Sequence, residues 1–145
     1  MHGRKNRKRV YRILIGGSPV ICAAALLCAS LSCKDTSNSI TSLNDIVFPA
    51  TNISYEKLVQ PLFNIGCATG TACHNTQGQP PDLTIYGLWK LDPGVIMAGD
   101  TNDSRFVWCI EARPGSRLMP PARPLSENQI HGLTRWVAEG AKDTQ

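Results

Sequence analysis

Residues 67 to 74 read Cys67-Ala-Thr-Gly-Thr-Ala-Cys73-His74, so two cysteines and a histidine fall within one short stretch. After this stretch the chain has only one more cysteine, Cys109. Thiol and imidazole groups are the side chains that anchor cofactors and soft metals. The stretch is therefore the feature around which the rest of the chain is interpreted.

A histidine directly after a cysteine, with a second cysteine upstream, is the arrangement that attaches a haem through thioether bonds and offers an imidazole to its iron. The usual pattern has two residues between the cysteines, whereas Ala68 to Ala72 separate them here. Both cysteines can reach the fixed vinyl groups of a haem only if this loop bulges outward. Gly70 and its small neighbours make the bulge sterically feasible. Without the bulge, Cys73 alone would hold the haem, and Cys67 would stay free or pair elsewhere.

A second candidate ligand lies in the proline-rich stretch 113–125, which is predicted to be an extended loop. Pro120 follows Met119 and restricts the methionine to an extended backbone, which would hold its thioether in one place. A thioether opposite a histidine raises the reduction potential of a haem. Met97 is the competing candidate, but no proline follows it. We therefore expect Met119 to be the ligand.

The hydrophobic pattern predicts helices on both sides of these motifs. Ser54 is suited to cap a helix whose apolar face runs up to Cys67, and Pro61 either breaks that helix or begins a second short turn. A short helix is expected near 83–91. Another is expected over 104–111, capped by Asn102 or Asp103, with Cys109 as a small apolar filler on its buried face. Its buried face would consist of Phe106, Val107, Cys109 and Ile110.

The last predicted helix has the clearest signals. Ser126 and Gln129 form a capping box, and Gly140 supplies a C-terminal stop. Between them a single stripe contains Ile130, Leu133, Trp136 and Val137. His131 lies off that stripe and is expected at the surface. The pattern as a whole predicts an all-α fold with long irregular loops.

The N-terminus has the layout of an export signal. Six basic residues precede an apolar run from Ile13 to Leu31, which ends in small residues. The run is also long enough for a retained membrane span, although Pro19 interrupts its start. Ser30-Leu31-Ser32-Cys33 resembles a bacterial lipobox, which predicts lipidation of Cys33 and a membrane anchor.

The chain accordingly divides into an export signal with its lipobox at 1–33, a polar linker at 34–53 and one folded domain at 54–145. The whole sequence has 15 basic and 11 acidic residues, a formal net charge of +4. Six of the basic residues lie before position 13, so the remaining chain has nine against eleven, or −2. The positive charge therefore belongs to the signal and gives no support to nucleic-acid binding.

Taken together, the chain resembles the class I cytochrome c fold and, more narrowly, the planctomycete-type cytochrome c domains of exported bacterial lipoproteins. The resemblance covers about Tyr55 to Lys142. The residues that carry it are Gln60-Pro61-Leu62-Phe63, Cys67 and Cys73-His74, Gly99-Asp100, Asp103-Ser104-Arg105-Phe106, Met119-Pro120-Pro121, Leu125-Ser126 and Trp136-Val137-Ala138-Glu139-Gly140-Ala141.

The resemblance implies a small cytochrome c-like helical fold around a covalent haem c. Cys67 and Cys73 would be the thioether sites, His74 the proximal ligand and Met119 the distal ligand. It implies an electron-transfer protein rather than an enzyme, tethered to a membrane in the bacterial cell envelope, on the periplasmic side or at the outer membrane, with redox proteins as partners.

Two other interpretations remain open. Cys67 and Cys73 could form a disulfide in a haem-free interaction module. Alternatively, Cys67, Cys73, His74 and Cys109 could supply the four ligands of a structural zinc site. Neither interpretation explains Met119-Pro120-Pro121.

Overall fold

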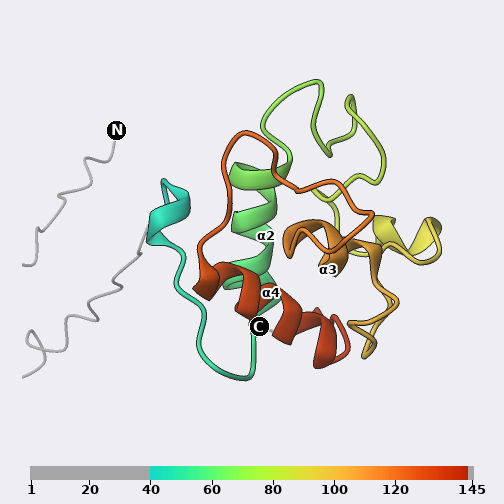
Figure 1. Ribbon diagram of the computed structural model, residues 1–145. Helices are drawn as coiled ribbons and strands as arrows, with labels where there is room; N and C mark the ends of the chain where they lie inside the picture. Colours follow the sequence, from blue (N-terminus) through green and yellow to red (C-terminus); the bar gives the residue numbers. More distant parts are fainter. Residues whose placement is uncertain (1–39, 144–145) are drawn as a thin grey trace, which may run out of the picture. The chain divides into compact units, whose positions relative to one another are not determined.

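The computed structural model describes residues 40–143, and Figure 1 shows their arrangement. Within this range the chain forms helices and loops without a β-strand, which confirms the all-α prediction. An isolated bridge joins Met97 to Asp100. None of the helices in this range is long and apolar enough to cross a membrane. The predicted export signal, Cys33 and the first part of the predicted linker lie outside the described residues.

A continuous helical segment leads to the cysteines, as the apolar spacing predicts. It consists of the π-helical turn η3 (Tyr55–Val59), the α-helical turn α2 (Gln60–Leu62) and the π-helical turn η4 (Phe63–Cys67). Ser54 is its N-cap, because its hydroxyl accepts the Lys57 amide N–H at 3.1 Å. Pro61 lies inside this segment, and the backbone stays helical on both sides of it, so the proline does not break the segment.

The middle of the chain contains two short helices. Of the helix expected near 83–91, only the 3₁₀ turn η5 (Leu88–Leu91) forms. The predicted cap of α3 (Arg105–Ile110) is wrong, because Ser104 and not Asn102 or Asp103 occupies that position. The carboxylate of Asp100 accepts the amides of Asn102 and Asp103, which closes a turn before the helix begins.

Helix α4 (Glu127–Ala138) follows its sequence signals closely. Ser126 and Gln129 form the predicted capping box: the Ser126 hydroxyl accepts the Gln129 amide, and the Gln129 side chain accepts the Ser126 amide. Leu133, Trp136 and Val137 of the predicted stripe are buried, and Ile130 is partly buried against the core. Gly140 has φ 98°, a left-handed conformation that suits glycine and ends the helix.

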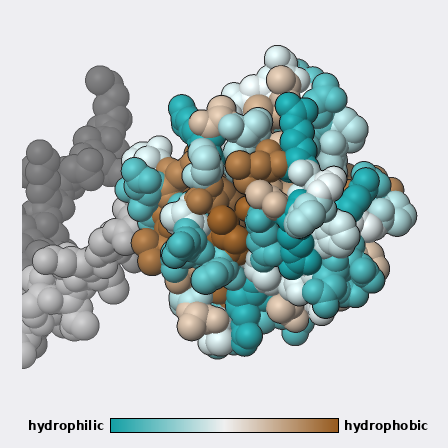
Figure 2. All heavy atoms as spheres, viewed as in Figure 1, coloured by the Kyte–Doolittle hydropathy of each residue, from teal (hydrophilic) through white to brown (hydrophobic). Residues whose placement is uncertain are grey.

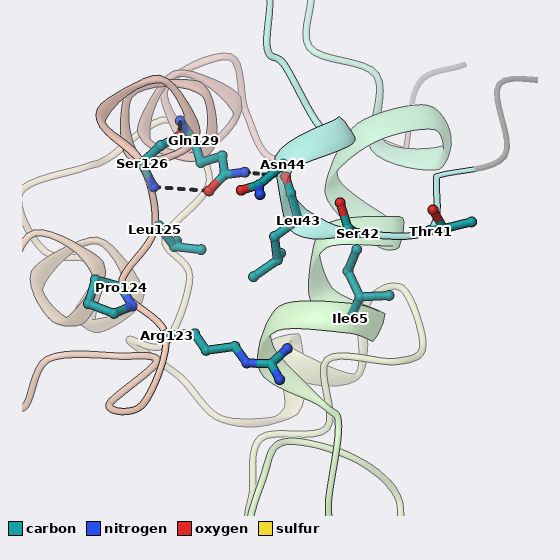
Figure 3. Close-up of a pocket in the computed structure, with 10 residues that line it drawn as sticks. All are labelled: Thr41, Ser42, Leu43, Asn44, Ile65, Arg123, Pro124, Leu125, Ser126 and Gln129. Atoms are coloured by element: carbon teal, nitrogen blue, oxygen red, sulfur yellow. Dashed lines mark hydrogen bonds between the residues drawn. The ribbon is translucent and has the colours of Figure 1, made fainter.

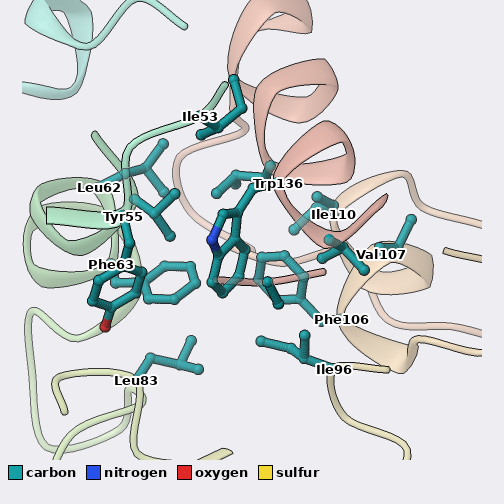
Figure 4. Packing of buried hydrophobic residues seen from close by; sticks show 14 of the residues in the cluster. Ile53, Tyr55, Leu62, Phe63, Leu83, Ile96, Phe106, Val107, Ile110 and Trp136 are labelled. Carbon is teal, nitrogen blue, oxygen red and sulfur yellow. The ribbon is translucent and has the colours of Figure 1, made fainter. Parts of the chain in front are cut away.

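Trp136 is buried in the core (Figure 4) and contacts aromatic side chains of η3, η4 and η5. Its ring centroid lies 5.7 Å from that of Tyr55, 5.9 Å from Phe63 and 6.1 Å from Trp89. Phe63 in turn meets Phe106 edge to face at 5.6 Å. Such tilted and edge-to-face contacts are the favoured geometries of aromatic pairs. The cluster therefore joins η4, α3 and α4 into one core.

A short 3₁₀ helix, η2 (Leu43–Asp45), and an extended lead-in up to Ile53 precede the first long segment. Ile46, Phe48 and Ile53 are buried in the core at 2%, 4% and 2% exposure. The stretch that the sequence predicts as the end of a linker thus packs against the domain. The folded unit therefore begins before position 54.

The lead-in is held by three side chains of α4 and its C-cap, which we call the clasp: Asn128, Gln129 and Glu139. Asn128 accepts the Phe48 amide and donates to its carbonyl, while Gln129 donates to the carbonyl of Leu43. Glu139 accepts the backbone amides of Asn52 and Ile53, each at 2.9 Å. The lead-in is thus fixed to α4 along its whole length by the clasp residues Asn128, Gln129 and Glu139.

Gly132 lets Phe48 pack directly on α4. A Cβ atom at this position would lie 2.1 Å from Cγ of Phe48. We expect Gly132→Ala to lower the free energy of unfolding by about 1–3 kcal/mol through overpacking, although alanine is the better helix former. Denaturant unfolding of the variant, compared with Gly70→Ala at an open loop position, measures the effect. Equal or greater stability of Gly132→Ala would contradict the packing of Phe48 on α4.

Glu139 makes the clasp dependent on pH. Burial raises its pKa, but the amides of Ile53 and Asn52 and the Arg135 guanidinium lower it by more, so its pKa lies below the ordinary 4.5. Such a carboxylate adds stability above the unfolded pKa, and this stability is lost as pH falls through the folded pKa.

We expect Glu139→Gln to lower the free energy of unfolding at pH 7 by about 1–2 kcal/mol, because hydrogen bonds to a charged acceptor are weakened. The difference from the parent should shrink once the pH falls below 4.5. Denaturant unfolding at a series of pH values measures both. Asp103→Asn, which removes an exposed carboxylate outside the clasp, is the control. A loss of stability that is the same at pH 3 and pH 7 would contradict this role of the charge.

Candidate functional site

One cavity brings together the residues that the sequence singles out. It has a volume of about 600 Å³ and lies between the end of η4, the loop 72–83, α3 and the loop 117–121. Its wall contains Cys67, Cys73, His74, Met119 and Cys109, together with apolar side chains and prolines. The apolar part comprises Leu83, Val95, Phe106, Ile110, Pro80, Pro81, Pro120 and Pro121. In Figure 2, apolar side chains gather in the middle of the face that carries α2 in Figure 1.

The loop from Cys67 to His74 bulges outward, as the five-residue spacing requires. The His74 amide donates to the Cys67 carbonyl at 3.0 Å and closes the loop at its base. The Cys73 amide donates to the Gly70 carbonyl at 2.8 Å inside it. Residues 69–72 are exposed, whereas Cys67, Cys73 and His74 are half-buried. The intervening residues thus turn to solvent, and both cysteines stay at the cavity.

Asn75 and Gly78 hold this loop in place, and the sequence interpretation missed both. The Asn75 side chain donates to the carbonyls of Ala68 and Gly70 at 3.0 and 2.8 Å. At Gly78 a Cβ atom would lie 1.9 Å from the Cys73 carbonyl oxygen. The available signals were an asparagine directly after the histidine and a glycine three positions after that asparagine, but both residue types are common in any loop.

Cys67 has a raised pKa. Burial, and after it the charge of the neighbouring Cys73, raises the pKa of Cys67 to about 12. Cys67 is therefore a protonated thiol at neutral pH. A thiol with a raised pKa is a poor metal ligand and a poor nucleophile on its own.

His74 has a buried ring nitrogen without a protein partner. Its Nδ1 atom is enclosed and makes no hydrogen bond, although buried polar groups are normally paired. The His74 backbone is fixed, since its carbonyl accepts the Leu83 amide at 3.0 Å and its amide donates to Cys67. His74 thus lies at the cavity wall with its Nδ1 atom unpaired.

Met119 also lines this cavity, and it comes from the loop that follows α3 in the chain. Its amide donates to the carbonyl of Cys109 at 3.0 Å, which fastens the proline-rich loop to α3. Met97, the competing candidate, is 41% exposed and does not line the cavity. The structure therefore brings Met119, and not Met97, together with Cys67, Cys73 and His74.

The cavity wall also contains polar residues that the sequence interpretation left without a role. Arg105 and Arg117 line it, and Arg105 pairs with Asp92 at 3.0 Å. Both partners of that pair are about half exposed, so the ion pair contributes little to stability. Cys109, interpreted as apolar filler, is half-buried and lines the cavity.

The zinc interpretation finds no support in the geometry. Among residues 40–143 no three His, Cys, Asp or Glu side chains converge closely enough to hold a metal ion. Cys67, Cys73 and Cys109, the cysteines in this range, are free thiols, so a disulfide does not join the first two.

A second cavity, of about 480 Å³, lies where η2, the end of η4 and the start of α4 meet (Figure 3). Its wall includes Leu43, Ile65, Arg123 and the capping residues Ser126 and Gln129. It contains none of the predicted site residues, and the hydrogen bonds drawn in Figure 3 serve the capping box and the clasp. We therefore regard the first cavity as the candidate site.

No protein-family model, curated protein or solved structure shows significant similarity to this chain.

Proposed function

We propose that the protein is a mono-haem c-type cytochrome that transfers electrons and is tethered to a membrane of the bacterial envelope. The observation that carries the proposal is the convergence of Cys67, Cys73, His74 and Met119 on one largely apolar cavity. These residues come from two segments that lie far apart in the chain. Apolar filling of a core would not require a thioether, an imidazole and two thiols around the same space.

The cavity suits a covalently held porphyrin in three respects. Its volume of about 600 Å³ lies in the range of about 300–1,000 Å³ typical of cofactor sites. Its wall is mainly apolar, as the faces of a porphyrin require, while Arg105 and Arg117 offer positive charge for the carboxylates of the ring. The buried Nδ1 of His74 has no protein partner, as in a site that is completed by a bound group.

Each residue has a distinct role in this proposal. Cys67 and Cys73 would hold the haem through thioether bonds, so that it is not lost during electron transfer. His74 and Met119 would hold its iron, and a thioether paired with an imidazole would raise the reduction potential. When bound, the haem would supply a one-electron iron couple. With Met119 as a ligand, the protein would carry electrons rather than activate a substrate.

The membrane tether is proposed from the sequence. An export signal followed by Ser30-Leu31-Ser32-Cys33 would place a lipidated Cys33 at the membrane surface, a few residues before the described part of the chain. Two or more acyl chains anchor a protein stably, whereas one binds only marginally. The partners would be redox proteins of the same envelope compartment.

An absorption spectrum of protein made in cells competent for cytochrome c maturation tests the proposal. We expect Soret and α bands that persist through denaturing extraction, because the thioether bonds survive unfolding. The ferric protein should show the weak long-wavelength band that the family resemblance implies for Met-ligated ferric haem, and Met119→Leu should lack it. Folded protein without Soret absorption would overturn the proposal, and a ferric parent without the weak band would overturn the Met119 assignment.

A further inference from the structure

Two arginines and one carboxylate lie on the wall of the first cavity. Arg105 and Arg117 line it together with Asp92. Oδ1 of Asp92 accepts a hydrogen bond from Nη2 of Arg105 at 3.0 Å. Within residues 40–143, Arg117 has no ion-pair partner. The wall therefore offers two positive charges to a bound group, but one of them is already paired with a carboxylate of the protein.

The ion pair between Arg105 and Asp92 is weak, although the backbone beneath it is fixed. The two side chains are 61% and 48% exposed, and exposed ion pairs contribute little free energy. One guanidinium nitrogen makes the contact, whereas a bidentate pair would use two. The Arg105 amide donates to the Gly94 carbonyl and the Phe106 amide to the Val95 carbonyl, both at 2.9 Å. The guanidinium can therefore change partner without movement of α3.

We propose that Asp92 is the partner of Arg105 before the haem binds, and that Arg105 exchanges Asp92 for a carboxylate of the porphyrin when it binds. This inference rests on the proposed function. The porphyrin of a haem has two carboxylates, so Arg105 and Arg117 would each face one of them. If the ion pair stayed intact, Asp92 would lie beside a second anion, which charge repulsion disfavours. The exchange involves hydrogen bonds only, and no covalent bond forms or breaks.

The exchange is tested in the Cys67→Ala/Cys73→Ala chain, which cannot form thioether bonds and binds a porphyrin reversibly. Absorbance titration measures its affinity for ferric protoporphyrin IX and for the dimethyl ester of that compound, which has no carboxylate charge. Asp92→Asn in this chain should bind ferric protoporphyrin IX about two- to fivefold more tightly, because an exposed ion pair no longer competes. Arg105→Gln should bind it about tenfold more weakly, because a charge-assisted hydrogen bond is lost.

Neither substitution should change the affinity for the dimethyl ester. Asp92→Asn/Arg105→Gln should bind ferric protoporphyrin IX like Arg105→Gln alone, because Asp92 acts only through Arg105. Asp103→Asn and Arg123→Gln are the controls, since they remove exposed charges that do not line this cavity. Both should keep the affinities of the Cys67→Ala/Cys73→Ala chain. Unchanged or weaker binding of ferric protoporphyrin IX by Asp92→Asn, or an equal gain for the ester, would overturn the exchange.

If the chain without these cysteines binds neither porphyrin, a crystal structure of the holoprotein decides the question. Arg105 should then contact a carboxylate of the porphyrin and lie apart from Asp92, whereas an intact pair between Arg105 and Asp92 would overturn the inference. Absence of covalent haem from the parent protein would instead overturn the proposed function.

Discussion

Replacing both Cys67 and Cys73 by alanine is expected to abolish covalent haem, whereas each single replacement should leave one thioether bond. Both thiols line the cavity because the loop between them bulges to solvent and is closed by the His74 amide on the Cys67 carbonyl. A vinyl group that has not reacted stays conjugated with the porphyrin. The α band of the reduced pyridine complex should therefore shift to longer wavelength in each single variant, and no extraction-resistant haem should remain in the double variant.

Cys109→Ala is the matched control, since it removes the third thiol of the same cavity. It should keep the α band of two thioether bonds. A parent α band that Cys67→Ala leaves unchanged would mean that Cys67 is a bystander. Haem would then be attached through Cys73 alone, the alternative that the five-residue spacing leaves open.

Gly78→Ala is expected to lower the stability of the holoprotein by about 3 kcal/mol, at the upper end of overpacking effects, and to reduce haem attachment. The new Cβ would lie 1.9 Å from the Cys73 carbonyl oxygen. That oxygen belongs to the backbone and accepts the amides of Asn75 and Gln79 at 3.1 and 2.8 Å, so it cannot move alone. The cysteine and the histidine after it would have to move as well.

Gly70→Ala is the comparison for this experiment, because no atom lies within 4 Å of a Cβ at Gly70. Denaturant unfolding and the ratio of haem to protein are measured for both variants. We expect the parent values for Gly70→Ala and losses of both for Gly78→Ala. Equal behaviour of the two variants would show that the contact between Gly78 and Cys73 does not hold the loop.

The helical part of the fold could be predicted because its signals are local. Ser54 and Ser126 cap helices where the sequence predicts them, and Trp136 lies on the predicted buried stripe. The predicted N-cap of α3 was wrong, because the Asp100 carboxylate, further upstream, accepts the amides of Asn102 and Asp103. A turn closed by an earlier side chain cannot be distinguished by spacing from a helix cap.

The lead-in shows that residue composition alone does not predict which residues are buried. Residues 34–53 are mostly polar, yet Ile46, Phe48 and Ile53 enter the core because Gly132 and the clasp accept them. The residues that hold the lead-in lie about eighty positions further along the chain. A local sequence pattern cannot predict contacts over such a separation. Similarly, the prolines after Met119 marked it as a candidate ligand in the sequence. The hydrogen bond from its amide to the Cys109 carbonyl could not be predicted, because it depends on how the loop folds back on α3.

The clasp determines where a mechanical load would enter the domain. A pull on the chain from the N-terminal side reaches Leu43 first and passes through Gln129, Asn128 and Glu139 into α4. The hydrogen bonds of the clasp lie one after another along the lead-in, so they would open in succession before the helical segment from Tyr55 bears tension. The Cys67 to His74 loop lies beyond that segment. If Cys33 is lipidated as we propose, a pull on that anchor would be borne by the lead-in and α4, and the spacing between thiols, imidazole and thioether would be kept.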